Sequence, residues 1–402
     1  MILRARIVVT MDGAPIENGA VAIEAKRIVD VGRFPEISAR HSGQEIVDLG
    51  EQALLPGLIN AHCHLDYTCL RGKISKQRSF AEWIRAINAE KAKLSSKDYV
   101  MSINEGFTEA RRFGTTTIAN LTAFPELISQ VQPLIRTWWF AELIDVREPS
   151  RANEIVDLAS RFLKAEENRG LAPHALFTAS PNLYGRCAEV SDHDNLLLST
   201  HLAESREEME MFRDASGPLY AFMSEIGRDM SDCSGITPLE RFVGPRGDRA
   251  LTTEWIVAHL NEIEDSDFDL LAGSTSKLHV VHSPRSHRYF GHSPFQLERL
   301  RALGFNICLG TDSLASNNDL NLFAEMRAFQ REFTEISPKE ILTMVTVNPA
   351  QALRRKNVLG KICRGAHVDL VAIPYSRGDF FEAIVGFEGD PWLMSDGEAT
   401  GS

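Results

Sequence analysis

Short apolar stretches and longer amphipathic stretches alternate along most of the chain. This alternation predicts strands that are each followed by a helix, and therefore a parallel sheet. We expect strands at residues 54–61, 115–120, 134–144, 175–179, 196–201, 254–259, 277–282 and 306–310. We expect helices from residue 79 onward and near residues 97–113, 150–168, 205–215, 294–303, 319–333 and 338–354. Eight such strands predict an α/β fold, a closed (β/α)8 barrel of the TIM type.

One connection is short for this pattern. Only residues 180–195 separate the strands expected at 175–179 and 196–201, and Pro181, Gly185 and Asp192 interrupt them. A crossover between parallel strands needs at least ~10–12 residues. Either the crossover helix is stunted, or residues are missing between these two strands.

Both ends of the chain have a different pattern. Residues 2–9, 20–25 and 27–32 read as short strands separated by turn residues, and 358–362 and 368–373 read as strands again. We therefore expect a small composite β-sandwich domain made from residues 1–55 and 357–402. The barrel is expected to occupy residues 56–356.

Composition limits the partners that the protein can have. A formal net charge of −12 over 402 residues, with no basic run, argues against nucleic acid. No apolar run approaches the ~18 residues of a membrane span, and the N-terminus lacks the features of a signal peptide. The 6 cysteines are scattered without a C-x-x-C pair, which is typical of reduced thiols in a cytoplasmic protein. A homodimer is compatible with the sequence, because cyclic dimers are the commonest oligomers.

Two histidines end the first strand expected in the barrel. His62 and His64 lie two residues apart, so their imidazoles face the barrel axis together while Cys63 faces outward. Barrel enzymes carry their catalytic groups at this end of the strands. The alternative is a pair of half-exposed surface histidines.

Further metal-binding side chains end other strands. His201 and His259 each close an apolar run, Asp312 follows another, and Glu204 comes three residues after His201. Together with the first pair, this places five metal-binding groups at the ends of four expected strands. Other histidines lie off such ends and read as ordinary surface or core residues: His41, His174, His193, His279, His292 and His367.

These motifs resemble the amidohydrolase superfamily, and more narrowly its branch of cytosine, guanine and adenosine-analogue deaminases and chlorohydrolases. The resemblance rests on Pro56-Gly-Leu-Ile-Asn-Ala-His-Cys-His64, His201-Leu-Ala-Glu204, His259, His282-Ser-Pro-Arg-Ser-His287 and Gly310-Thr-Asp-Ser-Leu-Ala-Ser-Asn-Asn318. It implies that a divalent metal is bound and that His259 contacts the metal-bound water. The implied metal ligands are His62, His64, His201 and Asp312.

Elementary chemistry agrees with these roles. Three imidazoles and one carboxylate leave a coordination position open for water, and the metal lowers the pKa of that water toward ~7. Asp312 and His259 can accept or orient its proton, and Glu204 can protonate a ring nitrogen and then the departing ammonia. Glu204 could instead be a carboxylate that stabilises a helix start. Zinc suits the ligand set, and iron(II) binds the same donors. Many members of the family that the chain resembles hold two ions through a carboxylated lysine on the fourth strand, so the absence of lysine from residues 174–181 implies a single ion.

Six residues are candidates for substrate contacts. Trp83 could equally be a core residue, and Arg285 could bind a carboxylate or brace its own loop through an internal ion pair. His64-Leu-Asp66 and the long segment 205–237 resemble the aminofutalosine deaminase-like group. This resemblance implies a 6-aminopurine nucleoside that carries a carboxylate, such as aminodeoxyfutalosine, with Arg71 or Arg285 facing the carboxylate. The full set is Asp66, Arg71, Trp83, Asn182, Arg285 and His287.

We therefore predict a metal-dependent hydrolase that deaminates an aminated heterocycle. Two alternatives remain open. The same site could hydrolyse a cyclic amide or an aryl chloride, or the chain could be a non-catalytic scaffold. Scaffolds of this kind usually lose metal ligands, whereas all of the expected ones are present here.

Overall fold

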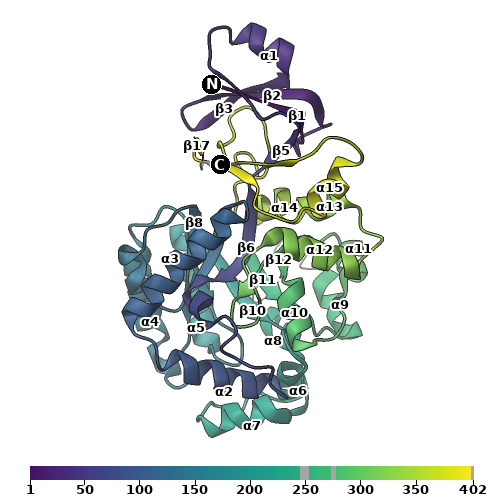
Figure 1. Cartoon of the computed structure of the whole chain (residues 1–402). Coiled ribbons are helices and arrows are strands. Elements are labelled where there is room, and N and C mark those ends of the chain that lie inside the picture. Colours follow the sequence, from purple (N-terminus) through teal and green to yellow (C-terminus); the bar gives the residue numbers. More distant parts are fainter. Residues whose placement is uncertain (245–252, 273–277, 400–402) are drawn as a thin grey trace.

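The computed structural model describes residues 1–244, 253–272 and 278–399. Lys277, at the start of one expected strand, and residues 400–402 of the expected small domain lie outside this range. Strands of the described residues form two sheets, a parallel sheet of nine strands and a mixed sheet of eight (Figure 1). The small sheet sits at one end of the larger one.

The nine-stranded sheet confirms the predicted barrel. Two residues after β13, the short β14 pairs in parallel with β6, the first strand of the barrel, and so closes the ring. Its strands are β6 (Leu58–His64), β7 (Thr115–Thr122), β8 (Arg136–Leu143), β9 (Arg169–Pro173), β10 (Leu197–Leu202), β11 (Trp255–His259), β12 (Leu278–His282), β13 (Asn306–Leu309) and β14 (Asp312–Ser313).

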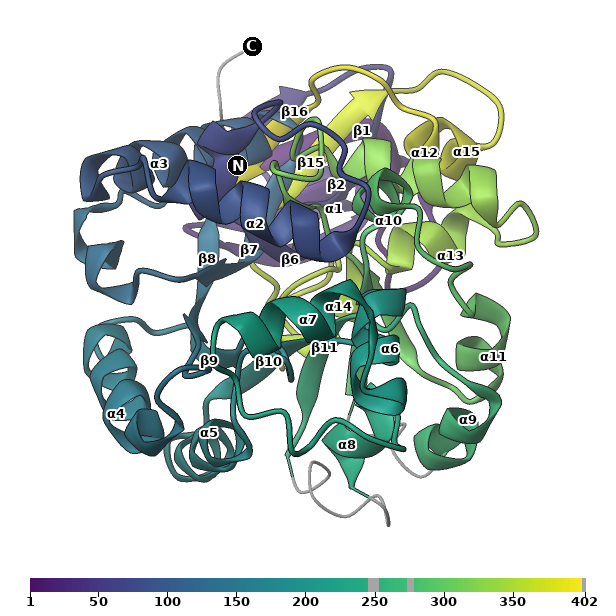
Figure 2. The same cartoon turned by 90° about the horizontal axis from the view of Figure 1, so that it is seen from below.

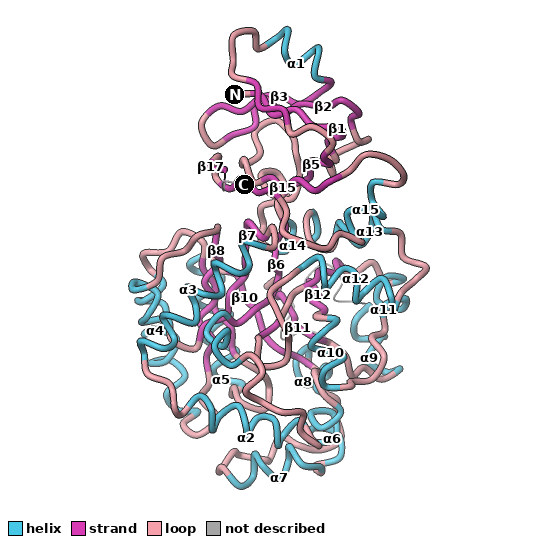
Figure 3. Tube along the Cα trace, viewed as in Figure 1, coloured by secondary structure: helices cyan, strands magenta, loops and turns pink. Residues whose placement is uncertain are grey.

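Helices surround this barrel (Figure 3). Serine side chains cap several of them, for example Ser79, whose hydroxyl accepts the backbone N–H of Glu82. The α-helices are α2 (Phe80–Lys91), α3 (Ser96–Arg112), α4 (Ala152–Leu163), α5 (Pro181–Asp194), α6 (Arg206–Asp214), α7 (Gly217–Glu225), α8 (Pro238–Val243), α9 (Asp265–Ala272), α10 (Pro284–Phe290), α11 (Leu297–Ala302), α12 (Leu322–Glu332), α13 (Pro338–Thr343) and α14 (Val347–Ala352). The 3-10 helices are η1 (Leu65–Leu70), η2 (Pro125–Gln130) and η3 (Pro149–Arg151).

The strand expected at 175–179 is wrong. The fourth barrel strand is β9, which ends at Pro173, and residues 175–179 form a turn in which the N–H of Ala179 reaches the carbonyl of Ala175. Hydropathy misses β9 because it contains Arg169 and Gly170. A Cβ at Gly170 would lie 2.4 Å from the ring of Phe140, so only glycine fits there. With the strand moved, α5 is a full crossover helix, neither stunted nor short of residues.

Two expectations near the end of the barrel also need correction. The helix expected at 338–354 is two helices, because Thr346 leaves the helical conformation between α13 and α14. Residues 358–362, expected to be a strand, instead form a turn around Gly360, which has a φ of 73°. A Cβ at Gly360 would lie 2.3 Å from the carbonyl oxygen of Thr346.

The small mixed sheet joins both ends of the chain. Its central β5 pairs in parallel with β1 from the N-terminal part and antiparallel with β15 from the C-terminal part. The domain limits at 55/56 and 356/357 remain predictions. The elements of this part are β1 (Ile2–Val8), β2 (Ile16–Glu24), β3 (Arg27–Arg33), α1 (Phe34–Arg40), β4 (Ile46–Asp48), β5 (Gln52–Pro56), β15 (Leu370–Pro374), α15 (Phe380–Val385), β16 (Trp392–Ser395) and β17 (Glu398–Ala399).

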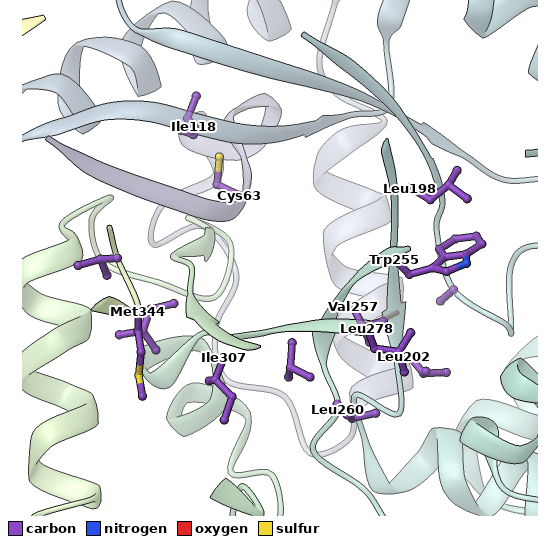
Figure 4. Close-up of a cluster of buried hydrophobic side chains, with 14 of the residues drawn as sticks. Cys63, Ile118, Leu198, Leu202, Trp255, Val257, Leu260, Leu278, Ile307 and Met344 are labelled. Atoms are coloured by element: carbon purple, nitrogen blue, oxygen red, sulfur yellow. The ribbon is translucent and has the colours of Figure 1, made fainter. Parts of the chain in front are cut away.

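Apolar side chains fill the barrel below its mouth. Alternate residues from β6 to β13 meet in one interior cluster, which includes Ile59, Ala61, Ala119, Leu121, Trp138, Phe140, Ala172, Leu197, Ile256, Val281 and Cys308. The intervening residues pack outward against the helices, as Cys63, Ile118, Leu198 and Val257 do in Figure 4. Because the barrel is a packed core, a site can form only above this layer.

The end of the barrel away from the small sheet carries the C-terminal ends of the strands. Figure 2 shows α2 and α7 crossing this end. Glu207 at the start of α6 accepts the backbone N–H groups of Phe80 and Ala81, and Arg85 of α2 pairs with Glu225 of α7. These contacts tie α2 to α6 and α7. Among the described residues, no helix has the length and apolar character needed to cross a membrane.

Candidate metal and catalytic site

A bulge in β6 turns two histidines toward the barrel axis. Ile59 and Ala61 belong to the interior cluster, so strict alternation would place Cys63 inside as well. The pairing of β6 with β7 shifts between Asn60 and Cys63, where β6 has one extra residue. The shift moves Cys63 to the outer core and lets His62 and His64 share the inner face. The predicted orientation of the pair is therefore present, but it depends on this bulge.

His201 reaches the same face from β10 by simple alternation with Leu197. Its Nδ1 lies 2.8 Å from the carbonyl oxygen of His174, which fixes the proton on Nδ1 and leaves Nε2 as a lone-pair donor. The His201 Nε2 lies 3.2 Å from the Nε2 of His64. The two imidazoles therefore present their Nε2 atoms to one point.

Contacts between the first and last strands of the barrel bring Asp312 close to the histidines. The Asn60 side chain bonds Thr311, and a Cβ at Gly310 would lie 2.7 Å from the carbonyl oxygen of His62. This close approach requires glycine. Asp312 itself adopts a φ of 57°, a left-handed conformation that is uncommon outside glycine and is found at functional sites.

The donor atoms of this group fit a divalent metal. The Nε2 atoms of His62 and His64 lie 3.8 and 3.9 Å from the Asp312 Oδ1. Ligands about 2.0–2.2 Å from a tetrahedral ion are roughly 3.3–3.6 Å apart. Both ring nitrogens of His62 are buried without a hydrogen-bond partner among the described residues. Buried polar atoms of this kind need a partner, and an ion at the shared point provides one.

Burial also holds these histidines in the state that binds metal. Loss of hydration lowers the pKa of His62, His64 and His259 well below the ordinary value of 6.5, and neighbouring imidazoles lower it further. Neutral imidazole is the form that coordinates metal ions.

Two of the predicted catalytic groups face each other beside this point. The Nε2 of His259 lies 3.7 Å from the Glu204 Oε1. His259 ends β11 with a φ of 77°, and its ring centroid lies 5.4 Å from that of His201. Burial raises the pKa of Glu204 well above 4.5, and the charges of Asp312 and Glu208 raise it further. Both effects favour the protonated form of Glu204.

Two of the predicted substrate contacts lie near this mouth. Trp83 of α2 packs on Phe80 and Phe290 and lines a cavity of about 400 Å³ between the loops that follow β6, β10, β11 and β12. Asp66 is buried, and its carboxylate accepts hydrogen bonds from Thr122 Oγ1 and the Ala123 N–H. It therefore braces the end of β7, while its Oδ1 has no hydrogen-bond partner among the described residues.

The structure does not bring the other four to the donor atoms. Arg71 forms an ion pair with Glu109 of α3, and Asn182 is exposed at the start of α5. Arg285 pairs with Asp319 at 2.5 Å, the internal brace that the sequence left open. The His287 Nε2 lies 2.9 Å from the Ser293 carbonyl oxygen, and its ring faces His282.

Sequence reasoning missed two residues of the mouth. His174 directly follows β9, and its ring centroid lies 4.8 Å from that of His201. The misplaced fourth strand hid it, because His174 then preceded a strand instead of ending one. Glu142, on the inner face of β8, brings a carboxylate within 3.7 Å of the His64 Nδ1. A charged residue in the run Trp138-Trp139-Phe140-Ala141-Glu142 could have revealed it.

This chain is similar over most of its length to several known proteins. A 5-methylthioadenosine/S-adenosylhomocysteine deaminase of Nitratidesulfovibrio vulgaris is 28% identical over 394 residues, which cover 92% of this chain and 83% of the relative. The corresponding Pyrococcus furiosus protein is 27% identical, with 94% and 87% covered. The solved Helicobacter pylori aminofutalosine deaminase, in complex with methylthio-coformycin, superposes with a TM-score of 0.87 at 20% identity over 99% of both chains. A zinc-bound adenosine deaminase from Xanthomonas campestris superposes with a TM-score of 0.80 at 22% identity, with 99% and 92% covered.

The family model described as the amidohydrolase family matches residues 53–392, which include the whole barrel and every residue of the mouth described above. This chain belongs to the amidohydrolase family.

Proposed function

We propose that this chain is a metal-dependent hydrolytic deaminase that removes the exocyclic amino group of an aminated heterocycle, with an adenosine derivative as substrate. The observation that carries the proposal is the meeting of three imidazoles and a carboxylate beside the His259–Glu204 pair. The deaminase names of relatives that span most of the chain support the choice of substrate.

We assign the metal to His62, His64, His201 and Asp312, with one ion per chain. A divalent cation held there supplies a Lewis acid that lowers the pKa of a water molecule toward ~7. Zinc is the ion we expect from this donor set. The fourth barrel strand β9, where a second ion would need a lysine, contains none, and neither do residues 174–181 that follow it.

The protons are handled by this chain's own residues. Glu204, kept protonated by burial, donates its proton to the ring nitrogen beside the carbon that bears the amino group while water adds to that carbon. His259 and Asp312 orient the attacking water. The proton that water loses on addition reaches the amino group through Glu204, and ammonia leaves. The remaining hydroxyl proton returns to Glu204 as the carbon becomes a carbonyl.

Recognition of the rest of the substrate is assigned to the cavity beside Trp83. Its aromatic wall suits a planar ring. Arg71 and Arg285 are engaged with carboxylates, so an anionic tail is better matched to the cations that line the cavity, which are Lys76, Arg78 and Arg206.

An ammonia-release screen on metal-loaded protein tests the proposal. The substrates are adenosine, 5-methylthioadenosine, S-adenosylhomocysteine and aminodeoxyfutalosine, with metal content measured on the same sample. We expect ammonia from at least one of them and one ion per chain. His201→Asn is expected to abolish both metal binding and ammonia release.

A cyclic amide and an aryl chloride serve as comparison substrates. Ring opening or chloride release without ammonia from any aminopurine would refute deamination. Two tightly bound ions per chain would refute the mononuclear site.

A further inference from the structure

Glu142 is a buried carboxylate for which the proposed chemistry has no role. It lies one residue before the end of β8, on the same face as Trp138 and Phe140, and its side chain is only 5% exposed. Its Oε1 has no hydrogen-bond partner among the described residues. A buried carboxylate oxygen without a partner is costly, so this atom is expected to have one in the working protein.

The group that faces Glu142 also lacks a partner. The Glu142 Oε1 lies 3.7 Å from the Nδ1 of His64, which has no hydrogen-bond partner within the described part of the chain. This distance exceeds a normal N–H···O bond by roughly 0.7 Å. Such bonds are often long in ligand-free sites and tighten when the ligand is bound.

Metal binding decides which nitrogen of His64 carries the proton. The Nε2 of His64 points at the donor group, 3.2 Å from the His201 Nε2, so the ion takes the lone pair of Nε2 and the proton must sit on Nδ1. In His201 the equivalent proton already has an acceptor, the His174 carbonyl oxygen at 2.8 Å. His64 has the Glu142 carboxylate in the corresponding position.

Burial raises the pKa of Glu142 to about 7, and the positive charge of Lys91 opposes this rise. The ammonium group of Lys91, at the end of α2, attracts the Glu142 carboxylate and lies 4.7 Å from the centre of the Tyr67 ring. The Tyr67 ring in turn stacks on His64 at a centroid distance of 5.8 Å. Lys91 thus supplies a counter-charge next to the carboxylate that faces the ligand.

We propose that Glu142 is a positioning residue that accepts a hydrogen bond from the Nδ1–H of His64 and thereby orients this ligand toward the metal. The inference rests on the proposed function, since it requires His64 to be a ligand. Carboxylates that hold a metal-bound histidine in this way contribute about 10–100-fold in metal affinity or activity.

Metal competition with a chelator tests this role directly. Zinc affinity is measured for the wild-type protein, Glu142→Ala, Glu142→Gln and, as a matched control, Glu126→Gln on the exposed 3-10 helix η2. We expect Glu142→Ala to lose about 10–100-fold in zinc affinity. Glu142→Gln retains a carbonyl acceptor and is expected to lose less, and Glu126→Gln to equal the wild type. The visible spectrum of the cobalt-loaded protein is expected to change in Glu142→Ala and to be largely restored in Glu142→Gln.

The possible results separate this role from the alternatives. Unchanged zinc affinity in both Glu142 variants, with the wild type binding zinc tightly, overturns the inference and leaves the proposed function standing. An increase in KM alone, with unchanged zinc affinity and spectrum, also overturns it, because Glu142 would then contact the substrate. If the wild-type protein binds no divalent metal, the proposed function itself fails. Thermal unfolding of the metal-free variants checks that each one is folded.

Discussion

Among the described residues, three groups of side chains have the composition of a metal site. The inner cluster consists of His62, His64 and His201, and the outer cluster consists of His282, His287 and Glu332. The third group, Glu142, His174 and His201, shares His201 with the inner cluster, whereas the inner and outer clusters share no residue. In each cluster one ligand atom per residue can be chosen so that all lie within 4.8 Å of one another. Residue types and spacing alone therefore do not distinguish them.

The face of the strand distinguishes the two clusters. In β12, Val281 belongs to the interior of the barrel, so His282 points outward into the layer between the sheet and the helices. There its ring stacks on Phe295 at a centroid distance of 4.2 Å. The inner cluster faces the axis, where Asp312 adds a carboxylate, whereas Glu332 is exposed on the outside. We therefore expect a histidine at a strand end to bind metal only when the backbone turns it inward.

Removal of the acid beside the inner cluster is expected to have the largest effect. Glu204→Gln keeps the shape of the side chain but removes the proton that its raised pKa retains. We expect kcat to fall about 10²–10⁴-fold, the usual contribution of a general acid or base. Zinc content is expected to remain at the wild-type level, because Glu204 is not one of the proposed ligands.

Glu208→Gln is the comparison variant for this experiment. Glu208 is equally buried, but its carboxylate accepts the backbone N–H groups of Ala203 and Glu204 and so supports the loop. We expect lower stability and a smaller loss of kcat from this variant. An equal loss of kcat in both would contradict the specific role of Glu204.

The sequence was sufficient to predict the barrel and the inner cluster for one physical reason. A parallel barrel buries its strands on both faces, which leaves apolar runs such as Trp255–Ala258, and a polar residue that ends such a run is conspicuous. The runs before His201, His259 and Asp312 have this form. The prediction failed at β9, where Arg169 and Gly170 replace the apolar run, and His174 was lost with it.

Side-chain partners were beyond the reach of the sequence. The sequence left Arg285 open between a substrate carboxylate and an internal ion pair, and it offered Arg71 as a substrate contact. In the structure, Asp319 and Glu109 supply carboxylates to these two arginines from within the chain. These partners are distant in sequence and meet only through the fold. The bulge in β6 is likewise set by its pairing with β7.

A substitution in α10, the helix that contacts both clusters, is expected to have an effect of intermediate size. Ser286 of this helix donates a hydrogen bond to the Asp312 carboxylate at 2.6 Å, and the next residue, His287, belongs to the outer cluster. Arg285 precedes both and lies 3.8 Å from Glu325, which is fully buried. Burial raises the pKa of Glu325 to about 7, although the charge of Arg285 lowers it. We therefore expect the main effect of Arg285→Met to be a lower free energy of unfolding, with only a small increase in KM.

The pH dependence of stability tests this ion pair. A carboxyl whose pKa is raised from 4.5 to about 7 contributes stability that is present below pH 4.5 and lost as the pH rises through 7. Glu325→Gln has no carboxyl to ionise and so avoids this loss. The difference in free energy of unfolding between Glu325→Gln and the wild type should therefore shift in favour of the variant by at most about 3 kcal/mol as the pH rises from 5 to 8.5. Urea unfolding at both pH values measures the change. A relative stability that is constant with pH would show that Glu325 is already ionised at pH 5.

Substitutions in the outer cluster are expected to have the smallest effects. They test whether only the inner cluster binds metal. His287 already directs one nitrogen to the carbonyl oxygen of Ser293, and an exposed carboxylate such as Glu332 loses little when it is neutralised. We expect Glu332→Gln to change the free energy of unfolding by less than about 0.5 kcal/mol and to leave the zinc content at one ion per chain. His287→Asn should also keep that ion, with a modest loss of packing against His282. The opposite result would be loss of the bound ion from either of these variants while His201→Asn keeps its ion. It would show that the outer cluster holds the metal. The direction of a strand-end histidine would then not decide where the ion binds.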